Sequence, residues 1–518
     1  MGKFYRADNL AEREIVRNLV VASLEINASS VCESDVEKIV QSIVRGSDTR
    51  FFHLVNASTL ETVLGGPGNA EPTFVPAEEI SRAKFGLAFR VEKEGPRQIS
   101  ESKEARLFLD RIVANIQRSV CARLRQVSLL SVISESFSQI DELYRDKSRW
   151  DLSTRSLLAL ANDAPWIHER LRSERSKLSL AELTNRILIE TAAYSHAPDA
   201  TEVLSKTEHA SLLSQMALML ELANHRDAIV GGFIEANLQI HSNGVIEFNE
   251  SFQEEIFQPY LVARIDDLIA SSADSYDLNF TTPSRGARGA GEVDSNVTAF
   301  MRAFEAEYEF SFEKINDLVD FFDDLAVRNG QAGGAMLFSE FKAILRAKIG
   351  MNRSEVDTFL DRFTLPIRSA WDKDLPLGCE KSDVLPWRFS RGLSVLLRPI
   401  PVVSKSPEVV AISAPHLHRW RQYLTYSILE GRLPDRLFSS AGMKKYLGQV
   451  ANKKGHEFTE ETAANIKKVL PSQRIEIKLT ELGAPQQPDL GDVDILSWDQ
   501  SAGLGFLIEC KRLKPALT

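Results

Sequence analysis

Apolar residues recur three and four positions apart over most of this chain, and that spacing places them on one face of an α-helix. The pattern predicts helices over residues 9–24 and 34–46, followed by an overwhelmingly helical region from Glu101 to about Leu268. Within this region Leu180–Tyr194 shows the periodicity most clearly. A helical bundle or scaffold is therefore the main architecture that the sequence predicts.

Helical spacing returns after a Gly-rich stretch, over Phe304–Val327, Leu337–Ile349 and Ser354–Phe363. The last of these segments opens with Ser354 and Glu355, which form a plausible helix cap. A further helix is expected over Leu417–Glu430, because Gly431 follows and Pro434 lies beyond it.

Short apolar runs broken by turn residues predict strands in two places before the carboxyl-terminal region. The first run is Phe85–Val91, in a small mixed α/β region. The second begins near Pro386 and continues through Val409–Ile412, where β-branched residues indicate a hairpin or β-ribbon.

The carboxyl-terminal region reads as a helix followed by three strands. The helix runs from Gly442 through Leu470, and the strands cover Arg474–Leu479, Gly491–Trp498 and Leu504–Lys511. The last two strands form an apparent hairpin over residues 499–503.

The predicted fold class is a mostly α multidomain protein with helical amino-terminal and central regions, a small β-ribbon adaptor and a carboxyl-terminal α/β module. Six consecutive regions are expected: a small mixed α/β region (1–100), a helical domain (101–280), a Gly-rich linker (281–295), a helical region (296–385), a β-ribbon with a helix as adaptor (386–440) and the terminal module (441–518).

The composition excludes several classes of protein but does not indicate a reaction. With 43% apolar and 26% charged residues among 518, the chain has the profile of a globular protein and not of a collagen-like or disordered one. The four cysteines are widely separated and form no C-x-x-C pair, so neither a zinc ribbon nor a disulfide framework is expected. A reducing, cytoplasmic location is therefore expected. No uncharged apolar run is long enough to cross a bilayer, so no membrane partner is expected.

The candidate chemistry lies in the last thirty residues. Strand alternation puts Glu509 and Lys511 on one face, and if this face matches that of Asp494 in the partner strand, the three side chains converge. Mg²⁺ prefers hard oxygen ligands, one or two carboxylates with water and a substrate phosphate. Asp494 and Glu509 could supply them together with the main-chain carbonyl of Cys510, and Lys511 would orient the attacking water. Phosphodiester hydrolysis is the reaction that this arrangement suits.

These residues resemble the PD-(D/E)XK nuclease superfamily, which has the restriction-endonuclease-like fold. The match consists of Asp494, the sequence Glu509-Cys510-Lys511 and a preceding acidic helix, and it covers residues 442–518. The resemblance implies Mg²⁺- or Mn²⁺-dependent cleavage of DNA, less often of RNA, by a mixed sheet flanked by helices.

Two departures from the family pattern stand in this sequence. Thr459 occupies a position where family members often carry a helix acid, which leaves Glu457, Glu460 and Glu461 as candidates for the site. Glu457 and Glu461 share one side of the helix and are favoured. The chain also stops seven residues after Lys511, where family members usually continue with a helix and a further strand, so the module is expected to be incomplete.

The predicted function is a metal-dependent nuclease with nucleic acid, DNA by preference, as its partner, in bacterial genome defence. The alternative is a non-catalytic interaction or scaffold protein that retains a truncated or degenerate nuclease module; a simple cross-strand ion pair would explain the same residues. A third reading is a nucleic-acid binder that uses only the basic residues near the carboxyl end. A protein partner or a homo-oligomer is compatible with each reading.

Other chemistry-bearing residues are interpreted as structural. His416 and His418 lie at a probable helix start with no third ligand in the sequence, and Ser413 and Ser390 lack a nucleophile-elbow context.

Overall fold

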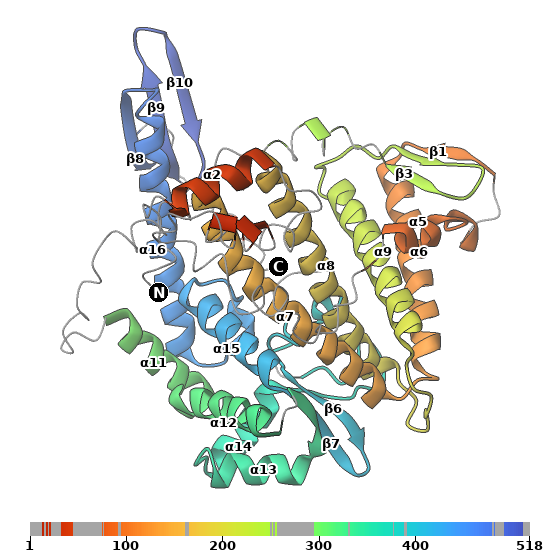
Figure 1. The fold of residues 1–518 in the computed structure, drawn as a ribbon. Helices are drawn as coiled ribbons and strands as arrows, with labels where there is room; N and C mark the ends of the chain where they lie inside the picture. Colours follow the sequence, from red (N-terminus) through yellow and green to blue (C-terminus); the bar gives the residue numbers. More distant parts are fainter. Residues whose placement is uncertain are drawn as a thin grey trace.

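The structure is a computed structural model of the whole chain, and it is mostly α-helical with three small sheets (Figure 1). This confirms the predicted fold class. Apart from a few isolated positions, the structure describes residues 33–44, 77–91, 95–160, 165–248, 295–329, 332–376, 378–387, 391–478 and 492–510. The predicted linker at 281–295 lies almost entirely outside the described residues.

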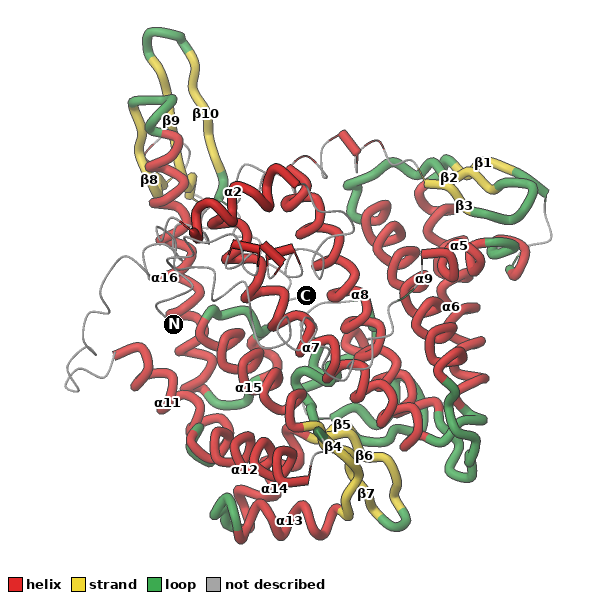
Figure 2. The backbone as a smooth tube through the Cα atoms, in the orientation of Figure 1, coloured by secondary structure: helices red, strands yellow, loops and turns green. Residues whose placement is uncertain are grey.

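Four long helices make up the first half of the molecule: α6 (Ser102–Leu124), α7 (Leu129–Leu160), α8 (Pro165–Ser195) and α9 (Lys206–Val230). α7 packs against α8, α8 also contacts α9, and α9 packs against α6 (Figure 2). α9 begins at a capping box in which Ser205 and Glu208 satisfy each other's main-chain amides. The predicted helical scaffold is confirmed over these residues.

A three-stranded antiparallel sheet interrupts the region that the sequence predicts as helical throughout. Its strands are β1 (Arg97–Ile99), β2 (Leu238–Ile240) and β3 (Ile246–Phe248), in that order. Strands this short leave no periodicity that could outweigh the helical pattern around them.

The strand prediction for Phe85–Val91 is wrong. After α5 (Ala77–Lys84) the chain forms turns and a 3₁₀-helix, η2 (Ala88–Arg90). Two main-chain amides of this segment donate to the β2–β3 turn: Gly86 N bonds Asn243 O at 2.9 Å, and Ala88 N bonds Gly244 O at 3.0 Å. Gly86 has a φ of +67°, which a strand does not allow.

The helices of the second half surround an aromatic core. They are α11 (Ser295–Tyr308), α12 (Glu313–Asn329), α13 (Phe338–Ala347), α14 (Arg353–Phe363) and α15 (Ala414–Leu429). The single helix predicted over 304–327 is two helices, because Glu309 takes a φ of +63° and Phe310 turns into the core. The predicted helix ending near Gly431 is confirmed, with Gly431 at a φ of +61°.

The predicted ribbon is the centre of a larger sheet. β6 (Ile400–Lys405) and β7 (Glu408–Ser413) form the expected hairpin, but β4 (Gly333–Leu337) and β5 (Thr364–Leu365) flank it, giving the order β4-β7-β6-β5. Trp387 to Leu397 contributes no strand among its described residues.

The terminal module has the predicted order of one helix and three strands. α16 (Ala441–Ile466) is followed by β8 (Ser472–Lys478), β9 (Asp492–Asp499) and β10 (Leu504–Ile508). The sheet is antiparallel with β9 in the centre, and it projects from the body along the upper half of α16 (Figure 1). Residues 511–518 lie outside the described part, so the predicted incompleteness of the module stays a prediction.

The buried apolar residues of both halves form a continuous core that reaches from Leu87 in the first half to Leu447 on α16. The predicted domain boundaries remain predictions. Among the described residues no helix combines the length and the apolar character needed to span a membrane.

Candidate functional site in the terminal sheet

The two faces of the terminal sheet differ sharply. On β9, Ile495 and Ser497 are fully buried, and they face α16, where Thr459 and Ala463 are also buried. Strand alternation directs Asp494, Leu496 and Trp498 to the opposite face, and these three side chains are half-buried. We call this second face, away from α16, the outer face.

Asp494 lies on β9 next to the point where the β9–β10 ladder ends. The last ladder pair is Ile495 with Ile508, and Glu509 directly follows the end of β10, so that continuation of the same register would put it opposite Asp494. The amide of Cys510 donates a hydrogen bond to Oδ2 of Asp494. The main chain that follows Glu509 therefore touches the Asp494 carboxylate through the Cys510 amide, and the expected role of the Cys510 carbonyl as a metal ligand stays a prediction. Lys511 lies outside the described residues.

The side chain of Cys510 points the other way, toward α16. Burial, with a further effect of the Asp494 charge, raises the pKa of its thiol, which hydrogen-bonds the hydroxyls of Thr459 and Thr462. The sulfur is thus a protonated packing group. Only the main chain of Cys510 is directed to the Asp494 side.

The helix glutamates are not brought to Asp494. Glu457 forms ion pairs with Lys454 at 3.4 Å and Lys453 at 4.0 Å on the exposed side of α16. Glu461 follows Thr459 by two residues, about 200° around the helix, and is exposed. Thr459 holds the position on α16 that faces the strands.

A carboxylate that the sequence analysis missed is Glu476 on β8. It lies between the ladder pairs Ile475–Ile495 and Ile477–Val493, which makes it the neighbour of Asp494 on the other side of β9. Glu476 has a φ of +53°, and its carboxylate is bonded to Nδ1 of His456 on α16. His456 thereby ties β8 to α16, and the hydrogen bond to Glu476 raises the pKa of its imidazole.

The donor set fits a hard divalent cation. Within the described residues no three histidine, cysteine, aspartate or glutamate side chains gather into a metal cage. Mg²⁺ does not need one, since it is usually held by one or two carboxylates with waters and substrate oxygens. Asp494 and Glu509 with the adjacent main chain match this smaller requirement.

Comparison with known proteins identifies the family. Residues 1–517 match the family model described as anti-phage protein Upx-like. The chain belongs to the Upx-like family of anti-phage proteins. The match spans both halves of the molecule and supports the expected role in defence, but it carries no statement about a nuclease or a metal. No curated protein and no solved structure matches this chain.

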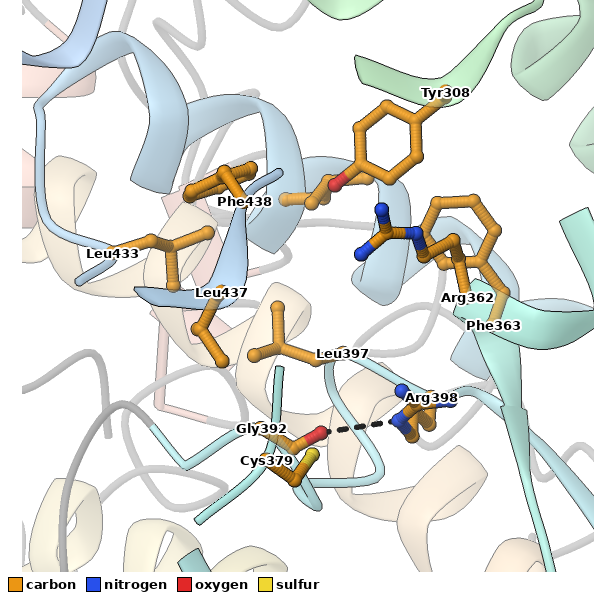
Figure 3. Close-up of a pocket in the computed structure, with 11 residues that line it drawn as sticks. Tyr308, Arg362, Phe363, Cys379, Gly392, Leu397, Arg398, Leu433, Leu437 and Phe438 are labelled. Atoms are coloured by element: carbon orange, nitrogen blue, oxygen red, sulfur yellow. Dashed lines mark hydrogen bonds between the residues drawn. The ribbon is translucent and has the colours of Figure 1, made fainter. Parts of the chain in front are cut away.

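This Upx-like family member also contains a small internal cavity of about 40 Å³, between α11, α14 and the segment before α16 (Figure 3). Arg362 and Arg398 line it. Arg362 pairs with Glu307 at 3.1 Å, and Arg398 donates to the carbonyl oxygens of Asp361 at 2.6 Å and Thr364 at 3.1 Å. A space this small holds a few waters at most, and its arginines already tie the surrounding segments together.

A larger cavity, of about 300 Å³, lies between α7 and the ends of β4 and β7. Ser413 lines it, donates to Oδ1 of buried Asp141 at 2.6 Å and accepts from the amide of His416 at 3.1 Å. Ser413 is therefore the N-cap of α15 and not a nucleophile. His416 is fully buried and bonds Val395 O at 3.2 Å, which agrees with the structural role expected from the sequence.

Proposed function

We propose that this anti-phage protein is a metal-dependent nuclease that hydrolyses phosphodiester bonds, DNA by preference, at the outer face of its terminal sheet. The observation that carries the proposal is the hydrogen bond from the Cys510 amide to Asp494, which places the main chain after Glu509 against the Asp494 carboxylate, just beyond the last β9–β10 ladder pair. Two carboxylates from adjacent strands and a nearby main-chain segment form the donor set that phosphodiester cleavage with Mg²⁺ requires.

In this proposal Asp494 and Glu509 would hold Mg²⁺ or Mn²⁺ together with the main-chain carbonyl of Cys510. The bound cation supplies charge for the phosphate and lowers the pKa of a water. Lys511 orients the attacking water and stabilises the charge that develops on the phosphate oxygens.

The test is a cleavage assay on supercoiled plasmid, linear duplex, single-stranded DNA and RNA, with Mg²⁺ or Mn²⁺ and with EDTA. We expect metal-dependent cutting that falls by roughly 100-fold or more in Asp494→Asn, Glu509→Gln and Lys511→Ala, the scale seen when one transition-state interaction is removed. Glu408→Gln, an exposed strand glutamate on β7, is the matched control and should cut like the wild type.

Glu457→Gln and Glu461→Gln belong in the same series, because they decide whether a helix acid takes part. Unchanged cutting is expected from both, since neither faces β9. Cutting that persists in EDTA, or that survives both Asp494→Asn and Glu509→Gln, would refute the metal site. No cutting by folded protein, together with phage protection that Glu509→Gln retains in cells, would instead establish the non-catalytic scaffold.

A further inference from the structure

We propose that the outer face of the terminal sheet binds single-stranded nucleic acid, with a base stacked on the indole of Trp498. The inference rests on the proposed function and names the form of its substrate. Trp498 is then a substrate-positioning residue on the same face as Asp494. The other side chains that would contact the nucleic acid come from all three strands.

Trp498 shares the outer face with Asp494, because the two residues are four positions apart on β9. At about 3.3 Å per residue the indole starts roughly 13 Å from the carboxylate. This distance suits a single nucleic-acid strand that has one phosphate at Asp494 and a base a few nucleotides away stacked on Trp498. Leu496 lies between them on the same face.

The cross-strand neighbour of Trp498 on β10 is Gly505. Because Gly505 has no side chain, Trp498 has no side chain directly opposite it on β10. A Cβ added to Gly505 would lie 3.9 Å from Cβ of Trp498, an ordinary contact, and would meet no other heavy atom within 4 Å. The position of Gly505 therefore has room for a side chain next to Cβ of Trp498.

Apolar and basic groups extend the same face. Leu507, opposite Leu496, is 65% exposed, although it lies in the middle of a strand pair. On β8, Arg474 is the other neighbour of Leu496, and Lys478 is exposed near the Asp494 end. Arg474 is bonded to Glu481 at 2.6 Å, but its side chain is half exposed and remains accessible to a phosphate.

An aromatic ring with apolar side chains next to it and cations farther along the same face is an arrangement that suits unpaired nucleic-acid strands. Bases stack on aromatic side chains regardless of sequence, and the backbone follows basic residues. In a duplex the base faces are already stacked on one another, so a flat open ring offers it little. The outer face therefore favours a single strand, or the unpaired end of a duplex.

The experiment measures binding without cleavage. Fluorescence anisotropy of labelled single-stranded oligothymidylate and of a labelled duplex is recorded in EDTA for the wild type, Trp498→Ala, Trp498→Phe and Gly505→Val. We expect Trp498→Ala to weaken single-strand binding roughly 5- to 150-fold, the range of one stacked base. Trp498→Phe should keep most of the affinity, and Gly505→Val should weaken it by covering the ring.

Phe506→Ala is the matched control, since Phe506 is 49% exposed but lies on the opposite face of the same hairpin. It should bind like the wild type, and the melting temperature of each variant establishes that the sheet is intact. Equal affinity of the wild type for duplex and single strand, or wild-type binding by both Trp498→Ala and Gly505→Val, would overturn the proposal.

The two proposals fail separately. Trp498-dependent binding without cleavage of any substrate would refute the nuclease and support the binding face. Metal-dependent cleavage with binding that ignores Trp498 and Gly505 would support the nuclease and refute the binding face.

Discussion

His416 shows how a single buried side chain links the structure to pH. The ring lies between Phe137, with centroids 5.0 Å apart, and Tyr144, and its Nε2 bonds the carbonyl of Val395. Burial lowers the pKa of His416 to about 4. Arg186, Glu182 and Arg419 are the charged groups whose fields reach it. The ring therefore stays neutral in the folded protein at any pH near neutrality.

The direction of the pH effect follows. A histidine titrates near pH 6.5 when unfolded but near 4 here, so its contribution to stability is complete above pH 6.5 and is lost as the pH falls toward 4. We expect a loss of roughly 3 kcal/mol over that interval from this residue. His416→Gln should show a shallower fall of melting temperature on acidification, measured by circular dichroism.

His456 provides a contrast with the opposite sign. Its pKa is raised by Glu476, so the contact between α16 and β8 is strongest below pH 6.5 and weakens as the pH rises through the raised value. His456→Gln should leave the fall of melting temperature below pH 6.5 unchanged.

If the fall of melting temperature on acidification is identical in the wild type and in His416→Gln, the assignment to His416 is contradicted.

At the scale of elements, the residue that caps the start of α14 differs between the sequence-based expectation and the structure. The sequence favours Ser354 with Glu355, but the structure uses Asn352. Its side chain accepts from the amide of Glu355 at 3.1 Å, and the carboxylate of Glu355 accepts from the amide of Asn352 at 2.7 Å. Lys314 pairs with Glu355 at 2.6 Å and fixes the box to α12.

Asn352→Ala should therefore lower the free energy of unfolding by about 1 kcal/mol, the usual cost of an N-cap. Ser354→Ala should cost less, because its hydroxyl only approaches Glu309 at 3.5 Å. Urea denaturation of the two variants compares them directly. A larger effect at Ser354 would return the cap to the position that the sequence favours.

The elements also show what the sequence could specify. Helices were predictable because their apolar spacing is local, and the β9–β10 hairpin was predictable because a short turn fixes its register. β4 was not predictable, since Gly333-Gly334-Ala335 becomes a strand only by pairing with β7, about 75 residues away. The side of α16 that meets the sheet was equally hidden in the sequence: Thr459 faces the strands, whereas Glu457 and Glu461, the acids expected at the site, are exposed.

At the scale of the whole molecule, the first-half helices hold the second half through buried polar contacts. Arg391 pairs with Glu190 of α8, and the other oxygen of Glu190 accepts from the amide of Val395 at 2.9 Å. Arg368 N donates to Ala193 O of the same helix at 3.0 Å. On α7, Asp141 accepts from Ser413. These contacts join residues that lie from 175 (Ala193 to Arg368) to 272 (Asp141 to Ser413) positions apart in the sequence. Separation of the helical scaffold from the sheet that precedes the terminal module would therefore break the buried contacts of the Glu190 and Asp141 carboxylates.

Arg391→Ala tests that dependence. Glu190 is 4% exposed, and removal of its partner leaves a buried carboxylate, which we expect to cost about 3–5 kcal/mol. Arg391→Met combined with Glu190→Gln should cost less, since no charge is left uncompensated. Arg328→Ala, in an exposed pair with Asp324, is the control and should change stability by under about 1 kcal/mol. Because Glu190 also holds Val395, the loss should appear in both halves at once, which amide hydrogen exchange of α8 and β6 would detect. Faster exchange confined to β6 would mean that the two halves fold independently.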